Sequence, residues 1–141
     1  MYAVIRVRGT VGLRKNVEDT LKMLRLTRKM HCVLIKDNDC MKGMLQKVKD
    51  FITWGEIDDD VLRSLIEKRG RKPVDARLSK KEADDIFKKV KSNEKIPEEI
   101  KPVFRLSPPS KGFKESIKQH YPDGELGYRG KEINELLKRM I

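Results

Sequence analysis

The feature that most constrains the fold is the alternation of two hydrophobic periodicities within residues 1–57. Short runs rich in Val and Ile, which are typical of strands, alternate with stretches whose apolar residues recur at helical spacing. Turn-forming Gly9 and Gly12 follow the first run, and the polar cluster at 37–39 follows the second. The pattern predicts strands at 2–8, 31–36 and 53–57 with helices at about 16–28 and 40–52. This is a self-contained β-α-β-α-β unit.

The first of these strands carries two arginines. Val and Ile alternate with Arg6 and Arg8 before the chain reaches Gly9. Because successive side chains of a strand point to opposite faces, the alternation predicts one buried face and one basic face. We therefore expect both arginines to point the same way.

Residues 58–141 show a different organisation, and we interpret them as an extension of helices and basic loops. Asp58–Asp60 begins a helix that Gly70 ends, and Ser79 with Glu82 forms a Ser-x-x-Glu capping box for the next helix. A short strand is predicted at 103–106, a stiff proline-rich loop at 107–113 and a last helix at about 131–140. Two interpretations of Phe113 stay open: its ring stacks on a base of a bound nucleic acid, or it packs into the core.

The net charge of +11 limits the classes of partner. Such a charge repels the chain from itself unless a polyanion compensates it, and nucleic acid is the first candidate. A membrane is disfavoured because no apolar run approaches the ~20 residues that a bilayer span requires. The N-terminus does not resemble a signal peptide, so we expect a cytoplasmic protein. Cys32 and Cys40 are expected to be buried thiols without a disulfide or metal role.

The positive charge is distributed along the chain and concentrated at turns, most densely in the basic loop Arg69–Lys72. The excess of basic over acidic residues is +6 in 1–57, +2 in 58–101 and +3 in 102–141. Arg and Lys on turns suit RNA because they attract phosphates and can follow an irregular surface. Lys88 and Lys89, interleaved with carboxylates, are interpreted as a solvated helix face. The candidate RNA-binding residues are Arg6, Arg8, Arg14, Lys15, Arg28, Lys29, Arg69, Arg71, Lys72, Lys111, Lys114, Arg129 and Lys131.

Catalytic and cofactor signatures are weak. No glycine-rich phosphate-binding loop is present, and His31 and His120 have no evident nucleophile and orienting partner in the sequence. We expect no catalytic residue, cofactor, metal or small-molecule substrate. An RNA-processing enzyme and an architectural DNA-binding protein stay open as alternatives. The first would need a convergent acid-base or metal cluster, and the second would associate with chromatin.

Several short segments, in order along nearly the whole chain, carry a resemblance to a known family. They are Ile5-Arg-Val-Arg-Gly9, Leu24-Arg-Leu26, Trp54-Gly55, Ile66-Glu-Lys-Arg-Gly70, Phe104-Arg-Leu-Ser-Pro-Pro109, Gly112-Phe113 and Gly124-Glu-Leu-Gly-Tyr-Arg-Gly130. Together they resemble the large-subunit ribosomal protein family called L-thirty in bacteria and archaea and L-seven in eukaryotes. The later segments look like the archaeal and eukaryotic form, and the first strand directly after Met1 looks like the archaeal version.

The resemblance implies more than the periodicity does. A strand-helix-strand order would by itself suggest parallel pairing, whereas the family implies an α+β fold with a three-stranded antiparallel sheet, a truncated ferredoxin-like arrangement. It also implies a non-catalytic constituent of the large ribosomal subunit, in the cytoplasm. Its partners would be ribosomal RNA and other large-subunit proteins.

Overall fold

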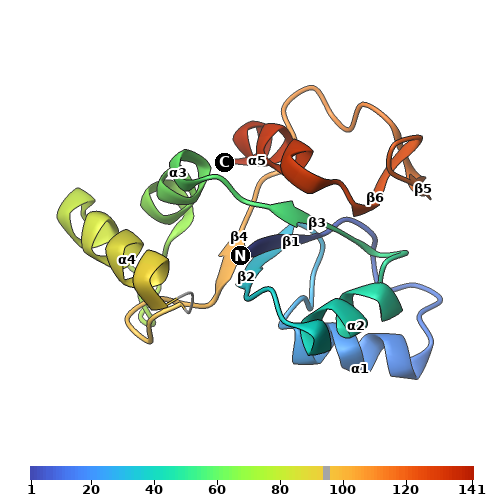
Figure 1. The fold of residues 1–141 in the computed structure, drawn as a ribbon, viewed down its shortest axis with the longest axis horizontal. Helices are drawn as coiled ribbons and strands as arrows, with labels where there is room; N and C mark the ends of the chain where they lie inside the picture. The colour runs from blue at the N-terminus through green and yellow to red at the C-terminus, as the bar shows by residue number, and fades with distance from the viewer. Residues whose placement is uncertain (94–95) are drawn as a thin grey trace.

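The computed structural model describes residues 1–93 and 96–141, with the side chain of residue 93 excepted, and shows a mixed sheet with helices on both faces (Figure 1). The strands are β1 (Tyr2–Arg6), β2 (His31–Ile35), β3 (Ile52–Glu56), β4 (Val103–Arg105), β5 (Ser116–His120) and β6 (Gly124–Tyr128). The helices are α1 (Lys15–Met23), α2 (Asp39–Lys47), α3 (Asp59–Arg69), α4 (Lys80–Asn93) and α5 (Ile133–Met140), with a 3₁₀ turn at Gly130–Glu132.

The sheet contains the expected antiparallel core and extends beyond it. β1 is central and pairs antiparallel with β2 and β3, with Val4 opposite both Val33 and Trp54. The full order is β4-β2-β1-β3-β6-β5, so the prediction of three strands is corrected to six. β4 joins β2 antiparallel, and β6 joins β3 in parallel. The α+β class is therefore confirmed, and the truncated ferredoxin-like description covers only the centre of the sheet.

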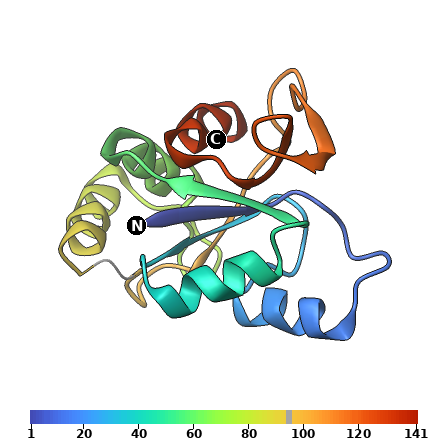
Figure 2. The ribbon, with the colours of Figure 1, turned by 45° about the vertical axis from the view of Figure 1, so that its right-hand side comes forward.

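Strand β1 is buried on both faces, which corrects the expected basic face. Ala3 and Ile5 pack into a core under α3, α4 and α5, while Tyr2 and Val4 pack into a second core under α1 and α2. Figure 2 shows the two groups of helices on opposite sides of the sheet. Arg6 is 2% exposed, so it does not share a solvent-facing surface with Arg8.

The start of α4 and the end of α3 agree with the signals predicted from the sequence. The predicted capping box is present, because the Ser79 amide donates to Glu82 Oε2 at 2.9 Å and the Glu82 amide donates to Ser79 Oγ at 3.4 Å. Gly70 ends α3 where no side chain fits, since a Cβ there would lie 2.4 Å from the Ile66 carbonyl oxygen.

Helix α1 ends at Met23, earlier than the expected 26–28, because the chain enters a left-handed C-cap. Arg25 has φ of 61°, the Leu26 amide donates to the Leu21 carbonyl at 2.8 Å, and the Arg25 amide donates to Lys22 at 2.9 Å. This pair of hydrogen bonds is a Schellman motif. It returns the buried Leu26 to the core and leaves the next three residues, 27–29, exposed.

Candidate nucleic-acid interface

A groove of about 430 Å³ lies where the loop after β1 meets the turn before β2. We call it the basic groove. Its charged lining is entirely cationic, its floor includes one aromatic ring, and no carboxylate lines it. The lining residues are Arg8, Gly9, Thr10, Val11, Thr27, Arg28, Lys29 and Phe51.

Buried Arg6 holds the two loops of the basic groove together from beneath. Its guanidinium donates to the carbonyl of Leu26 at 2.7 Å and to those of Arg8 and Gly9 at 3.0 Å each. Burial lowers the pKa of this guanidinium from its ordinary value. The carbonyls satisfy a cation that would be costly to bury alone. Arg6 thus positions the groove and does not line it.

Arg8 forms one wall of the groove against an aromatic floor. Its guanidinium carbon lies 5.2 Å from the centre of the Phe51 ring, and its Nη1 donates to the Asp50 carbonyl at 3.3 Å. The amides of Val7 and Arg8 both donate to the Phe51 carbonyl, at 2.9 and 3.1 Å. The carboxylate of Asp50 contacts His120 Nε2 at 2.9 Å, which ties β5 to this edge of the groove.

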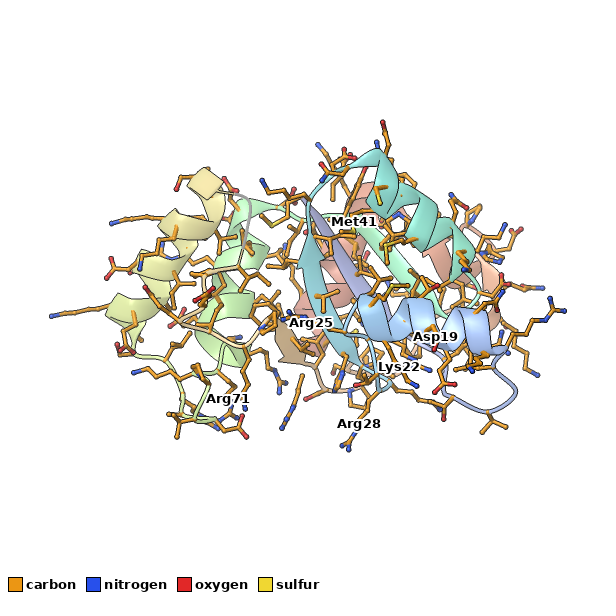
Figure 3. All side chains as sticks on the ribbon, turned by 90° about the horizontal axis from the view of Figure 1, so that it is seen from below. Asp19, Lys22, Arg25, Arg28, Met41 and Arg71 are labelled. Atoms are coloured by element: carbon orange, nitrogen blue, oxygen red, sulfur yellow. The ribbon has the colours of Figure 1, made fainter. Side chains whose placement is uncertain are left out.

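Arg28 and Lys29 form the opposite wall. Lys29 crosses closely over Gly9, since a Cβ on that glycine would lie 2.8 Å from Lys29 Cε. Figure 3 shows Arg28 projecting from the turn that follows α1, beyond the exposed Lys22 and Arg25. Within the described part of the chain, neither Arg28 nor Lys29 forms an ion pair. Three of the predicted residues, Arg8, Arg28 and Lys29, therefore converge on one site.

Arg14 and Lys15 lie at the far end of the loop that contributes Arg8 to the groove. Both are exposed, at the N-terminus of α1. The same loop exposes Val11 almost completely, at 97%. The loop thus places two further cations beyond the basic groove. The sequence has no acidic residue between positions 8 and 15.

The predicted cluster at Arg69–Lys72 is divided by the fold. Arg69 binds the end of α5, donating to the Ile141 main-chain oxygen at 3.0 Å and to Ser107 Oγ at 2.6 Å. Lys72 pairs with Glu82 at 2.7 Å. Arg71 sits on the hairpin loop that bridges to Arg77, where its Nη1 donates to the Asp75 carbonyl at 3.3 Å (Figure 3).

The predicted residues of the C-terminal segment are also divided. Arg129 is buried and pairs with Glu125, and Lys114 pairs with Glu135. Lys111 and Lys131 are exposed, and Lys111 has φ of 63°. Phe113 is partly buried against the core, as one of its two interpretations anticipated.

Two residues important to the site escaped the sequence interpretation. The helix predicted at about 40–52 includes Phe51, whereas in the structure that helix ends at Lys47 and the Phe51 ring forms the floor of the groove. Asp50 supplies the carbonyl that receives Arg8. The one sequence signal for these two residues is their position directly before a strand and next to an exposed turn.

Other chemistries find little support among residues 1–93 and 96–141. No group of three His, Cys, Asp or Glu side chains is arranged to hold a metal ion. None of the helices is long and apolar enough to cross a membrane. Cys32 is buried, which raises the pKa of its thiol to about 12, whereas Cys40 is exposed, contrary to expectation. Burial and the cations Arg105 and Arg28 lower the pKa of His31.

Comparison with known proteins agrees with the resemblance seen in the sequence. The family described as ribosomal protein L30p/L7e matches residues 2–52. The chain is similar to large ribosomal subunit protein uL30 of Methanosphaera stadtmanae, with 46% identity and 100% of both chains covered. It is similar to those of Methanococcus maripaludis, at 48%, and Archaeoglobus fulgidus, at 46%, with 99% of each chain covered. The uL30 family is structural and non-enzymatic. The chain belongs to the ribosomal protein L30p/L7e family, also named uL30.

Proposed function

We propose that this protein is a structural constituent of the large ribosomal subunit in the cytoplasm and that it binds ribosomal RNA chiefly through the basic groove. The family membership and the names of the relatives support the ribosomal role. The observation that carries the RNA contact is the convergence of Arg8, Arg28 and Lys29 around Phe51 without a lining carboxylate. Phosphates compensate such cations, and an unstacked base can lie against the ring.

The basic side chains contribute unequally to the proposed RNA contact. Arg8, Arg28 and Lys29 make the principal contacts, and Arg14 and Lys15 extend them along the same loop. Lys111 and Lys131 are exposed and Arg71 is half-buried, and these three residues supply peripheral contacts in the distributed manner expected from the sequence. Arg6, Arg69 and Arg129 act within the protein, because their guanidinium groups already bind main-chain or carboxylate oxygens. The surfaces left over are available to neighbouring large-subunit proteins.

The test compares two triple variants of equal charge. Arg8, Arg28 and Lys29 are changed to Gln in one, and the exposed Lys80, Lys81 and Lys88 of α4 are changed to Gln in the other. Affinity for a fragment of large-subunit ribosomal RNA is measured across a salt series. Removal of the groove cations should reduce the slope of log affinity against log salt by about 2, at ~0.7 for each single-stranded phosphate contact.

The α4 variant is the control and should retain most of the slope. Equal losses in both variants would mean that total charge, and not the groove, determines binding. A wild-type affinity that stays flat with salt would contradict the phosphate contacts themselves.

A further inference from the structure

A second groove, of about 380 Å³, lies at the outer edge of β2 and is mainly apolar. We call it the edge groove. It runs between the end of α1, the outer half of β2, the start of α2 and Pro102 before β4. In Figure 3, Arg25 and Met41 lie on either side of it beside β2. It shares no lining residue with the basic groove.

The β2–β4 ladder stops at this groove for a chemical reason. Cys32 pairs with Phe104, and the Leu106 amide donates to the Met30 carbonyl at 3.0 Å. Hydrogen-bonded pairs of an antiparallel ladder recur every two residues, so the next such pair would join Leu34 to Pro102. Proline has no N–H to donate. No backbone hydrogen bond joins this pair in the described chain, and β4 covers only residues 31–33 of β2.

The outer edge of β2 therefore continues past its partner strand. By the same alternation, Leu34 and Lys36 direct their main-chain groups away from β1. The Lys36 carbonyl accepts from the Asn38 amide at 3.1 Å, and among residues 1–93 and 96–141 no further backbone partner is found for the Leu34 groups or the Lys36 amide, which face the groove. A strand edge with open main-chain groups is a template for an added strand.

The side chains around this edge suit an apolar occupant. Met23 ends α1 with 67% of its surface exposed, and Met41 is half-buried across the groove. Methionine adapts its shape to different apolar partners because its side chain is unbranched and polarisable. The other apolar residues that line the groove are Leu24, Val33, Leu34, Ile35, Ile96 and Pro102.

The charged groups on the groove are both cationic. Arg25 and Lys36 line it, and neither forms an ion pair within residues 1–93 and 96–141. The nearby carboxylates, Asp37 and Asp39, lie against Lys42 at 2.8 and 4.0 Å. An occupant with a carboxylate at one end complements this arrangement.

We propose that the edge groove receives an extended segment of another protein, which pairs with β2 at Leu34–Lys36, inserts apolar side chains between Met23 and Met41, and directs an acidic residue toward Arg25 or Lys36. A second copy of this chain is disfavoured, because two such edges would oppose their own Arg25 and Lys36. An RNA strand is disfavoured, because its phosphates would face the methionines and it has no peptide groups to continue the ladder. The inference is independent of the basic groove.

The test uses the full chain, labelled with ¹⁵N, and two synthetic hexapeptides. One has the sequence Glu-Val-Thr-Val-Thr-Glu, and the other replaces both Glu with Lys. The acidic peptide should shift the amide resonances of Leu34 and Lys36 in a saturable way, slow their hydrogen exchange, and bind about tenfold tighter than the lysine peptide. The variant Arg25→Glu/Lys36→Glu should reverse that preference.

A matched pair of variants separates the groove from general surface effects. Met23→Asn replaces the apolar side chain at the groove mouth with a polar, uncharged one and should weaken acidic-peptide binding about tenfold. Val74→Asn makes the same kind of change at a residue 89% exposed elsewhere, and should leave peptide binding unchanged. Equal weakening in both variants, or no saturable shift at Leu34 and Lys36, overturns the proposal.

Two other outcomes also overturn it. If a single-stranded oligouridylate, and not the acidic peptide, shifts Leu34 and Lys36, the groove binds RNA. If the shifts follow protein concentration without peptide, the groove joins two copies. Because Arg8, Arg28 and Lys29 lie outside the edge groove, their Gln variants should keep peptide binding. A failure of the RNA proposal would thus leave this result intact.

Discussion

The basic groove and the cavity at the C-terminal end of the molecule have similar basic content and opposite electrostatics. Each contains three basic side chains and an aromatic ring that one arginine approaches: Arg8 over Phe51 at 5.2 Å, and Arg129 over Tyr121 at 5.8 Å. The C-terminal cavity, of about 220 Å³, is also lined by four carboxylates, Glu115, Glu125, Glu132 and Glu135. Its cations are compensated within the protein, whereas those of the basic groove need an external anion.

The difference shows that the fold, more than the number of basic residues, decides which cations are available. In the C-terminal cavity Arg129 also donates to Thr53 Oγ1 at 2.9 Å and to the Glu125 carbonyl at 2.7 Å. Arg139 donates to the carbonyls of Ser110 and Gly112. These groups hold β6, β3 and the loop before β5 together. The C-terminal cations are therefore structural, and substitutions should separate stability from RNA binding.

The largest expected effect is on stability, at the buried pair of the C-terminal cavity. Burial opposes ionisation of Glu125, yet hydrogen bonds from Arg129 and the amides of Glu115 and Lys114 hold the pKa of that carboxyl below its ordinary value. Arg129→Met should lower the free energy of unfolding by about 3–5 kcal/mol, because it leaves a buried carboxylate unpaired. Urea denaturation measures the loss, and RNA affinity of the folded fraction should change less than about twofold.

A double-mutant cycle sharpens this result. Glu125→Gln combined with Arg129→Met should cost less than the sum of the single changes, because the pair is then removed together. Additive losses would mean that the two side chains stabilise the fold independently. Loss of RNA binding without loss of stability would place Arg129 at the RNA surface.

The second effect is on RNA affinity, and it compares one cation from each region. Arg28→Glu should weaken binding to a ribosomal RNA fragment by about tenfold or more, because it reverses a charge in the basic groove. Lys114→Glu should weaken binding much less, since Lys114 already pairs with Glu135. Fluorescence anisotropy at one fixed salt concentration gives both affinities. Equal losses would remove the distinction between the two regions.

A smaller effect is expected at the aromatic floor of the basic groove. Phe51→Leu keeps an apolar contact with the second core but removes the ring under Arg8. RNA affinity should fall by a factor of about 3 to 10, corresponding to ~1 kcal/mol of lost stacking. The salt slope should stay unchanged, because no cation is removed. A changed slope would show that Phe51 acts by positioning Arg8.

The smallest effect concerns Glu82, which belongs to neither region and serves as a reference. Hydrogen bonds, first from Lys72 and then from Ser79, lower the pKa of its carboxyl from 4.5 to about 2. A lowered pKa gives a stability contribution that is full above pH 4.5 and disappears as the pH falls through about 2. The difference in urea midpoint between wild type and Glu82→Gln should therefore shrink across this window. A difference independent of pH would exclude ionisation as its cause.

Much of the central fold could be predicted from the sequence, because its strands and helices follow strong periodicities. The outer strands could not. β5 is exposed at every position, and β6 contains Gly124 and Gly127, so neither shows the alternation that marks a strand. Their pairing depends on tertiary contacts such as Thr53 Oγ1 to the Gly127 carbonyl, at 3.1 Å.

The candidate site was predictable in part for the same reason. The alternation of the first strand identified Arg8, and an exposed turn identified Arg28 and Lys29. Nothing local distinguishes Arg6 from Arg8, because the burial of Arg6 depends on helices covering both faces of β1. For Arg129, the Glu125 four residues earlier was a local hint of pairing.

The guanidinium of Arg6 has a consequence for the proposed binding of RNA. By joining the carbonyls of Arg8, Gly9 and Leu26, it sets the spacing of both walls of the basic groove within the folded chain. The walls need not be ordered at the moment of encounter, so little of the binding free energy is spent on arranging them. In the proposed function, the basic groove is therefore a preformed surface, and the conformational ordering on binding falls on the flexible RNA strand.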